Sequence, residues 1–265
     1  WVDALAENVL PPGSVVLLGG SNVVDFRVRV AQGHVRHDML PSFWSHMGIA
    51  VSRESFLSVP LDARLDPTRV PSTNGIMESR FAEYGDPFAY PNIAVINFAD
   101  NADAVVGYAR GLYKQRSAVD LPQLLIAWLA FAWGTGDTGN PLLRHLGVPA
   151  AAFVETAFGI AGIEMTPGVA WVGSCPEAIW QSAIWWHEYY EKTATAFPPS
   201  EERHTPEKLP GSIVPCGPYM IRQPAAAGSD ARPAHPPTQD AATPAARDGR
   251  PAPILRNPDR RWSLT

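Results

Sequence analysis

The chain has 265 residues, of which 46% are hydrophobic and only 18% charged, and its formal net charge is −5. A chain of this length builds one compact core, and its weakly acidic balance gives no electrostatic footprint for nucleic acid. Its two cysteines, Cys175 and Cys216, cannot make a disulfide scaffold, and neither the zinc-finger nor the redox spacing of paired cysteines occurs. We therefore expect no nucleic-acid partner, no metal and no cofactor, and the compartment stays open.

In chain order, the first half of the sequence predicts one helix and four strands. The helix covers 1–10 and the strands cover 14–18, 45–52, 75–80 and 91–98. Between the second and third strands, the segment 53–74 is rich in Pro, Asp, Arg and Ser. We expect it to be a long excursion away from the sheet.

The second half predicts helices and then a tail. The helices run from a cap at Asp100 to about 116, from a cap at Asp120 over 121–133, over 149–160, and from Cys175 to about 193; 168–173 and 211–221 are strand-like. From 224 onward the chain is rich in Pro and Ala, so it cannot bury enough apolar surface to offset its ordering entropy. We predict one folded domain over 1–223 and a disordered tail over 224–265.

One of the two cysteines opens a predicted helix, in the stretch SCPEAIWQSAIWW. Apolar residues recur on most sides of this helix, which predicts that it lies in a core. A thiol at a helix N-terminus faces unpaired N–H groups and the positive end of the dipole, which lower its pKa and can hold an oxyanion. Cys175 is therefore a candidate nucleophile; the alternative is an inert buried cysteine that fills space.

A base for this thiol comes from the strand at 45–52. Period-two alternation sends Met47, Ile49 and Val51 to one face and His46, Gly48 and Ala50 to the other. The two small residues beside the histidine predict that a helix packs closely on their face. That arrangement would bring a helix-borne thiol to the imidazole of His46. A core histidine bonded to the backbone is the alternative.

A third group should orient the imidazole, and Glu78 is an acid inside the apolar strand GIMES. Its competitors are Glu54 and Glu83, in more loop-like contexts, and a solvent-facing charge at a strand end is the alternative role of Glu78. A metal held by His34, His37 and His46 would need one element to gather them, and none is apparent. The Gly19-Gly20-Ser21-Asn22 stretch follows a strand but lacks the lysine of a phosphate loop, so we interpret it as a turn.

The order of four motifs resembles a known family. PPGSVVLLGG, SFWSHMGIAVS, GIMES and SCPEAIWQSA follow the order of the circularly permuted NlpC-like branch of the papain-like cysteine hydrolases, an order that lecithin:retinol acyltransferase-like proteins share. The resemblance spans about residues 10–195. It implies an α+β, permuted papain-like fold, in which an antiparallel sheet packs against the Cys-bearing helix, with a helical insertion at 121–150. It also implies Cys175 as nucleophile, His46 as general base and Glu78 as orienting acid.

The leading hypothesis is therefore a thiol hydrolase. His46 would deprotonate Cys175, and the thiolate would attack an amide carbonyl of a peptide or peptidoglycan-like substrate to form an acyl-enzyme that water releases. Two alternatives stay open. One is a lipid-directed acyltransferase or phospholipase on the same fold, and the other is a catalytically inactive binding module.

The apolar run LPQLLIAWLAFAWG, 121–134, bears on the lipid alternative. It is shorter than the ~20 residues that span a bilayer, so a spanning helix is excluded for this run. Trp128, Phe131 and Trp133 predict either a helix at a membrane interface or a core helix. If this helix does not lie in the core, the run favours a membrane as partner, through peripheral contact of 121–133.

Overall fold

The computed structural model describes residues 11–61, 75–86, 88–98, 102–115, 121–170, 173–196 and 212–214. Several predictions concern residues outside this set. They are the helix at 1–10, the caps Asp100 and Asp120, Cys216 and the tail over 224–265. The described part contains one antiparallel sheet and a set of helices, which confirms the α+β class.

Within the described ranges, the sheet has six strands in the order β4-β3-β2-β1-β5-β6, and each neighbouring pair is antiparallel. The strands are β1 (Val15–Gly19), β2 (His46–Ala50), β3 (Ser55–Ser58), β4 (Met77–Arg80), β5 (Asn92–Asn97) and β6 (Ser212–Val214). We expected the segment 53–74 to leave the sheet, but its residues 55–58 form β3, which pairs with both β2 and β4. Its four residues form a strand because the short turn after β2 brings them alongside β2, where β4 pairs with their other side.

The helices follow the predicted order, with one addition. They are α2 (Val23–Ala31), α3 (Ala102–Lys114), α4 (Leu121–Trp133), α5 (Pro149–Ile160) and α6 (Pro176–Ala196), with 3-10 turns η1 (Gly33–Val35), η2 (Phe81–Tyr84) and η3 (Pro141–Arg144). The addition is α2, whose pattern is weak because arginines interrupt its apolar face. Asn22 caps it by accepting the N–H of Asp25 at 2.8 Å. Residues 168–170 form no strand.

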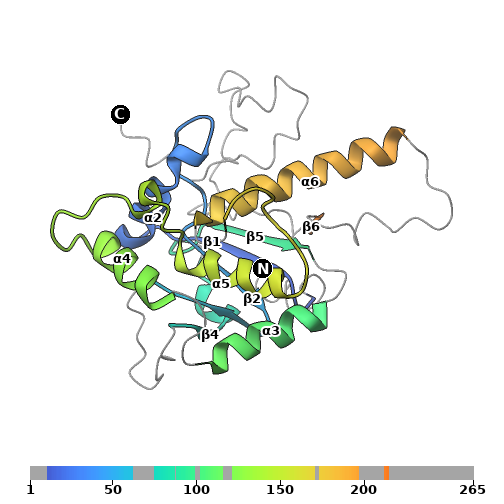
Figure 1. Cartoon of the computed structure of the whole chain (residues 1–265), viewed down its shortest axis with the longest axis horizontal. Helices are drawn as coiled ribbons and strands as arrows, with labels where there is room; N and C mark the ends of the chain where they lie inside the picture. Colours follow the sequence, from blue (N-terminus) through green and yellow to red (C-terminus); the bar gives the residue numbers. More distant parts are fainter. Residues whose placement is uncertain are drawn as a thin grey trace, which may run out of the picture.

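The two faces of the sheet are covered differently. The first core cluster takes Val15, Leu17, Met47, Ile49, Leu57, Ala94 and Ile96 from the strands, together with buried residues of α2, α3, α4, α5 and α6. The second takes the alternate strand residues Val16, Leu18, Ala50, Phe56, Ile93 and Val95, together with the aromatic residues Phe81, Tyr84 and Tyr90. Figure 1 shows α3, α5 and α6 lying over the same side of the strands. We call the first the helix-covered face and the second the aromatic face.

Candidate functional site

Cys175 lies where the sequence predicts, immediately before the first residue of α6. Its carbonyl accepts the N–H of Ile179 at 3.2 Å, which places the residue at the cap of the helix. The backbone N–H groups of Ala178 and Glu177 lie near the thiol and act to lower its pKa. The helix end therefore offers the thiol the donors that a thiolate or an oxyanion would need.

The surroundings of the thiol oppose its ionisation. Cys175 is a free cysteine and 1% exposed. Burial raises the pKa of the thiol to about 12, and the nearby charges of Glu177 and Glu155 act in the same direction, against the two N–H donors. In the described arrangement the thiol is protonated at neutral pH.

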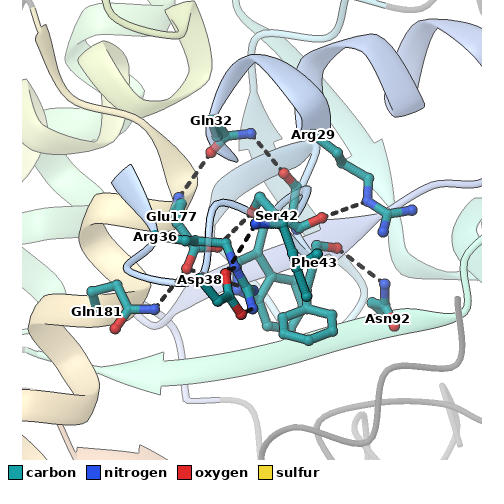
Figure 2. A network of polar contacts seen from close by, with 11 residues as sticks. Arg29, Gln32, Arg36, Asp38, Ser42, Phe43, Asn92, Glu177 and Gln181 are labelled. Atoms are coloured by element: carbon teal, nitrogen blue, oxygen red, sulfur yellow. Dashed lines mark hydrogen bonds and ion pairs between the residues drawn. The ribbon is translucent and has the colours of Figure 1, made fainter. Parts of the chain in front are cut away.

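Glu177, two residues further along, is the centre of a buried polar network (Figure 2). Its carboxylate accepts from Ser42 Oγ at 2.6 Å and from Gln181 Nε2 at 2.7 Å, and Arg36 Nη1 lies 3.9 Å away. Its backbone N–H donates to Gln32 Oε1 at 2.9 Å. Burial raises the pKa of Glu177, although Arg36 and the hydrogen-bond donors oppose this rise.

Most of that network belongs to the segment between α2 and β2, which we call the 33–43 loop. Within it, Arg36 donates to both carboxylate oxygens of Asp38, at 2.8 and 2.5 Å, and its guanidinium lies 4.7 Å from the ring centroid of Phe43. Gln32 Nε2 donates to the carbonyl of Trp44 at 2.7 Å and so joins the two ends of the loop. The loop therefore rests on the first turn of α6.

A second buried carboxyl lies on α5. Glu155 Oε1 accepts from Thr166 Oγ1 at 2.5 Å and from Ser174 Oγ at 2.9 Å. Burial raises its pKa, and the two hydroxyl donors oppose the rise. The prediction of site residues omits Glu155, although the sequence does indicate it, because it is the only acid in the apolar helix PAAAFVETAFGI. The thiol of Cys175 is thus close to two carboxyl groups.

His46 lies on the aromatic face, away from the thiol. Its ring stacks on that of Tyr84, with centroids 6.2 Å apart and planes at 13°, and lies 6.2 Å from the ring of Phe56. Those two residues belong to the core cluster of the aromatic face, whereas Cys175 belongs to that of the helix-covered face. The predicted alternation along β2 is confirmed, but the structure does not bring His46 and Cys175 together.

The small residue Gly48 has a different role from the one that we expected. A Cβ atom there would lie 2.6 Å from the ring of Phe56 and would collide with the carbonyl oxygen of Leu57. Close packing of β3 and its phenyl ring against β2 requires the glycine. The expected helix does not approach this face, and α5 and α3 contact β2 from the helix-covered side.

Glu78 is also remote from both residues. It pairs with Leu57 across β3 and β4, accepts from Ser55 Oγ at 2.6 Å, and lies 4.0 Å from the guanidinium of Arg110 on α3. These contacts place Glu78 at the β4 edge of the sheet, on the helix-covered side. Of its competitors, Glu83 accepts the N–H of Arg80 at the start of η2. The three predicted catalytic residues therefore occupy three separate places.

The remaining alternatives can be located as well. Across the described ranges, no three His, Cys, Asp or Glu side chains lie close enough to hold a metal ion. The Gly19-Gly20 turn packs against a carboxylate, since a Cβ on Gly20 would collide with Asp25 Oδ2. An acid at that point disfavours a phosphate and supports the interpretation as a turn.

Helix α4 is partly core and partly surface. Trp128 is fully buried, and its Nε1 donates to the carbonyls of Leu146 and Gly147 at 3.1 and 2.7 Å. Ile126 and Trp133 are exposed on the outer side, and the helix contains no charged residue. None of the helices in the described part is long and apolar enough to cross a membrane.

Comparisons with protein-family models, with curated proteins and with solved structures find no match to this chain. The residues and their geometry are therefore the basis for any function assigned to it.

Proposed function

We propose that this chain is a binding module that docks on a lipid interface, and that Cys175 does not act as a nucleophile in the closed arrangement. The observation that carries the proposal is a group of exposed apolar side chains around α2, α4 and η3, which we call the apolar corner. They are Val30, Val35, Met39, Leu40, Ile126, Trp133 and Leu143. Exposed apolar groups of this kind mark interaction surfaces.

The elements that carry the apolar corner contact one another. Helix α4 packs against α2 and against η3. Asn140 Nδ2 donates to the carbonyl of Ala31 at 2.8 Å and ties the start of η3 to the end of α2. Arg27 Nη1 donates to the carbonyl of Ala132 at 3.2 Å, at the other end of the contact. The elements that carry the side chains of the corner are therefore held against one another.

Charge favours an anionic lipid interface over a second apolar protein surface. Two basic residues lie beside the corner, the exposed Arg144 and the half-buried Arg27. Of the acidic residues there, Asp38 is paired with Arg36 and Asp137 is exposed. Basic residues around an apolar helix face attract anionic headgroups while the apolar side chains enter the boundary with the acyl chains.

Co-sedimentation with anionic vesicles tests this surface. We expect the parent chain to sediment, and a double Ile126→Ser, Trp133→Ser variant to lose binding at least tenfold, since burial of such side chains contributes about 1.5–3 kcal/mol each. Ile160→Ser is the matched control, because Ile160 is also exposed but lies at the end of α5. Equal loss in the control, or no sedimentation of the parent, would overturn the proposal.

The permuted papain-like fold is proposed on the order of its parts. Strands β1 and β2 precede an acid-bearing β4, and a helix that begins after a cysteine comes late in the chain. Hydrolysis by Cys175, His46 and Glu78 stays a prediction, favoured by the two N–H donors at the thiol and opposed by the separation of the three residues.

Iodoacetamide labelling separates the two functions. In a Cys216→Ser chain, we expect the native Cys175 to resist alkylation and to react after unfolding, because the thiol is buried and protonated. Rapid native labelling that His46→Ala slows would instead support the hydrolase.

A further inference from the structure

The second half of α6 carries three aromatic side chains that contact one another, Trp185, Trp186 and Tyr189, which we call the α6 aromatic cluster. The rings of Trp185 and Tyr189, one helical turn apart, stack with their planes at 11° and their centroids 5.4 Å apart. The ring of Trp186 stands edge-on to both, at 79° and 89°. The three rings therefore form an angle rather than one flat layer.

This cluster is exposed to solvent and yet attached to the core. Trp185 is 56% exposed and Tyr189 is 49% exposed, whereas Trp186 is partly buried and packs against the core of the helix-covered face. Single exposed apolar side chains are common on protein surfaces, but adjacent Trp and Tyr rings in a fixed arrangement are typical of a binding surface. Because the rings already hold one another in place, little side-chain freedom is lost when a ligand binds.

The place where the C-terminal part of the chain leaves the sheet indicates a ligand for this cluster. Strand β6 ends at Val214 and contacts α6, and the chain continues from there to residue 265. Figure 1 shows β6 beside α6, and it shows α4 and the second half of α6 at opposite ends of the molecule. The chain after β6 therefore starts next to the helix that carries the cluster, and the cluster is a different surface from the apolar corner.

The composition of 215–265 fits an aromatic surface on an acidic domain. This part has seven arginines and four aspartates but no lysine or glutamate, so its net charge is +3, whereas residues 1–214 carry −8 of the total of −5. It also has ten prolines, and the stretch ARPAHPP, 231–237, places Pro233 and Pro236 three residues apart, directly after Arg232. A polyproline II helix has three residues per turn, so these two prolines would lie on one edge of it.

We propose that the stretch 231–237 docks on the α6 aromatic cluster of the same chain as a polyproline II segment. Pro233 and Pro236 pack against the exposed aromatic rings, as proline-rich peptides do in aromatic-lined grooves. Arg232 approaches Glu188, which lies within the same turns of α6 as the cluster. The opposite net charges of the two parts of the chain favour this contact.

The connection between β6 and this stretch is long enough. Residues 215–230 span up to about 55 Å when extended, whereas the 21 residues of α6 are about 32 Å long. A short flexible tether gives its ligand an effective concentration on the order of millimolar, so that even a weak site is filled for a large fraction of the time. An external proline-rich partner would have to compete with the chain's own segment.

A spin label on the full chain tests the docking. The label is attached at position 229 through Ser229→Cys in a Cys216→Ser chain, in which Cys175 is buried. We expect the label to weaken the indole N–H signal of Trp185 in NMR spectra about twofold or more, since the tethered segment fills the site for much of the time. The signal of Trp133 on α4 should keep its intensity. The indole signals are assigned from Trp185→Phe and Trp133→Phe chains.

Two double substitutions in the C-terminal part separate docking from mere proximity. Pro233→Ala with Pro236→Ala should restore the Trp185 signal, whereas Pro251→Ala with Pro253→Ala, the matched control, should leave it weakened. The proposal is overturned if the label has no effect in the parent, or if the effect survives the first double substitution.

Other occupants of the cluster give different results. If a spin-labelled chain weakens the Trp185 signal of a separate isotope-labelled chain to the same extent, a second copy occupies the cluster and the proposal is wrong. If the label has no effect but anionic vesicles broaden this signal, the cluster is a lipid surface and the proposal is again wrong. Co-sedimentation of the apolar-corner variants is measured separately, so the lipid proposal and the docking proposal can fail independently.

Discussion

The two faces of the sheet place neighbouring residues of one strand in unrelated surroundings. On the helix-covered face, the cluster that includes Met47 reaches Cys175, with two buried carboxyl groups beside the thiol. On the aromatic face, His46 meets the rings of Tyr84 and Phe56. A thiol and an imidazole can each be well placed in a fold and still be separated by the backbone of the sheet.

The largest expected effect is on the free energy of unfolding, in which substitutions of two tryptophans of α6 should differ. Trp180 is buried against Trp44, whereas Trp185 is 56% exposed. We expect Trp180→Ala to lower the free energy of unfolding by about 4 kcal/mol through lost burial and a cavity. Trp185→Ala should change it by less than about 0.5 kcal/mol. Urea unfolding of both variants measures the contrast, and comparable losses would show that α6 is not packed as described.

Gly48 tests the other face of the sheet. Gly48→Ala should destabilise the chain by about 2 kcal/mol, since the new Cβ would collide with β3 backbone and with the ring of Phe56. Gly107→Ala on α3 is the control, because no atom lies within 4 Å of its Cβ position, and it should stabilise by about 0.5–1 kcal/mol. If Gly48→Ala is tolerated like the control, then β3 does not pack against β2 as the structure has it.

Substitution of Glu155 should have a smaller effect on the free energy of unfolding, and this effect depends on pH. Its pKa is raised by burial, so the folded state holds the proton more tightly than the unfolded state. The stability that this provides is complete below the ordinary pKa of about 4.3 and is lost as the pH rises through the folded value. Glu155→Gln cannot ionise and keeps an oxygen for Thr166 and Ser174. Its stability relative to the parent should therefore increase from pH 4 to pH 8.

Calorimetry or urea unfolding at several pH values measures this difference. Glu54→Gln is the control, since Glu54 is exposed and should show no comparable trend. A Glu155→Gln variant with the pH dependence of the parent would mean that the carboxyl group is hydrated in solution.

The smallest expected effect is the most informative about the two faces. His46→Phe keeps a ring beside Tyr84 and should leave the native labelling rate of Cys175 within about twofold, because labelling at the thiol depends on its own thiolate and access. A drop of tenfold or more would show that the imidazole reaches the thiol in solution.

Much of the local structure could be predicted from the sequence. The alternation in β2 separates Met47 from His46 as the structure does, and Cys175 stands at the start of its helix. The strand β3 could not be predicted because it has only four residues, with a serine at each end. The helix α2 could not be predicted because Asp25, Arg27 and Arg29 interrupt its apolar residues. Pairing with β2 and β4 stabilises β3 as a strand, and packing against α4 stabilises α2 as a helix.

The α+β class, the two faces of each strand and the thiol at a helix N-terminus can all be read along the chain, because they follow from periods of two and 3.6 residues and from capping. Which face of the sheet the helices cover became clear only from the folded arrangement. The same is true of the room that Gly48 makes for Phe56, and of the contacts by which the buried Glu177 joins the 33–43 loop to the first turn of α6. A period defines two faces without saying what packs on each, and that choice depends on residues far apart in the chain.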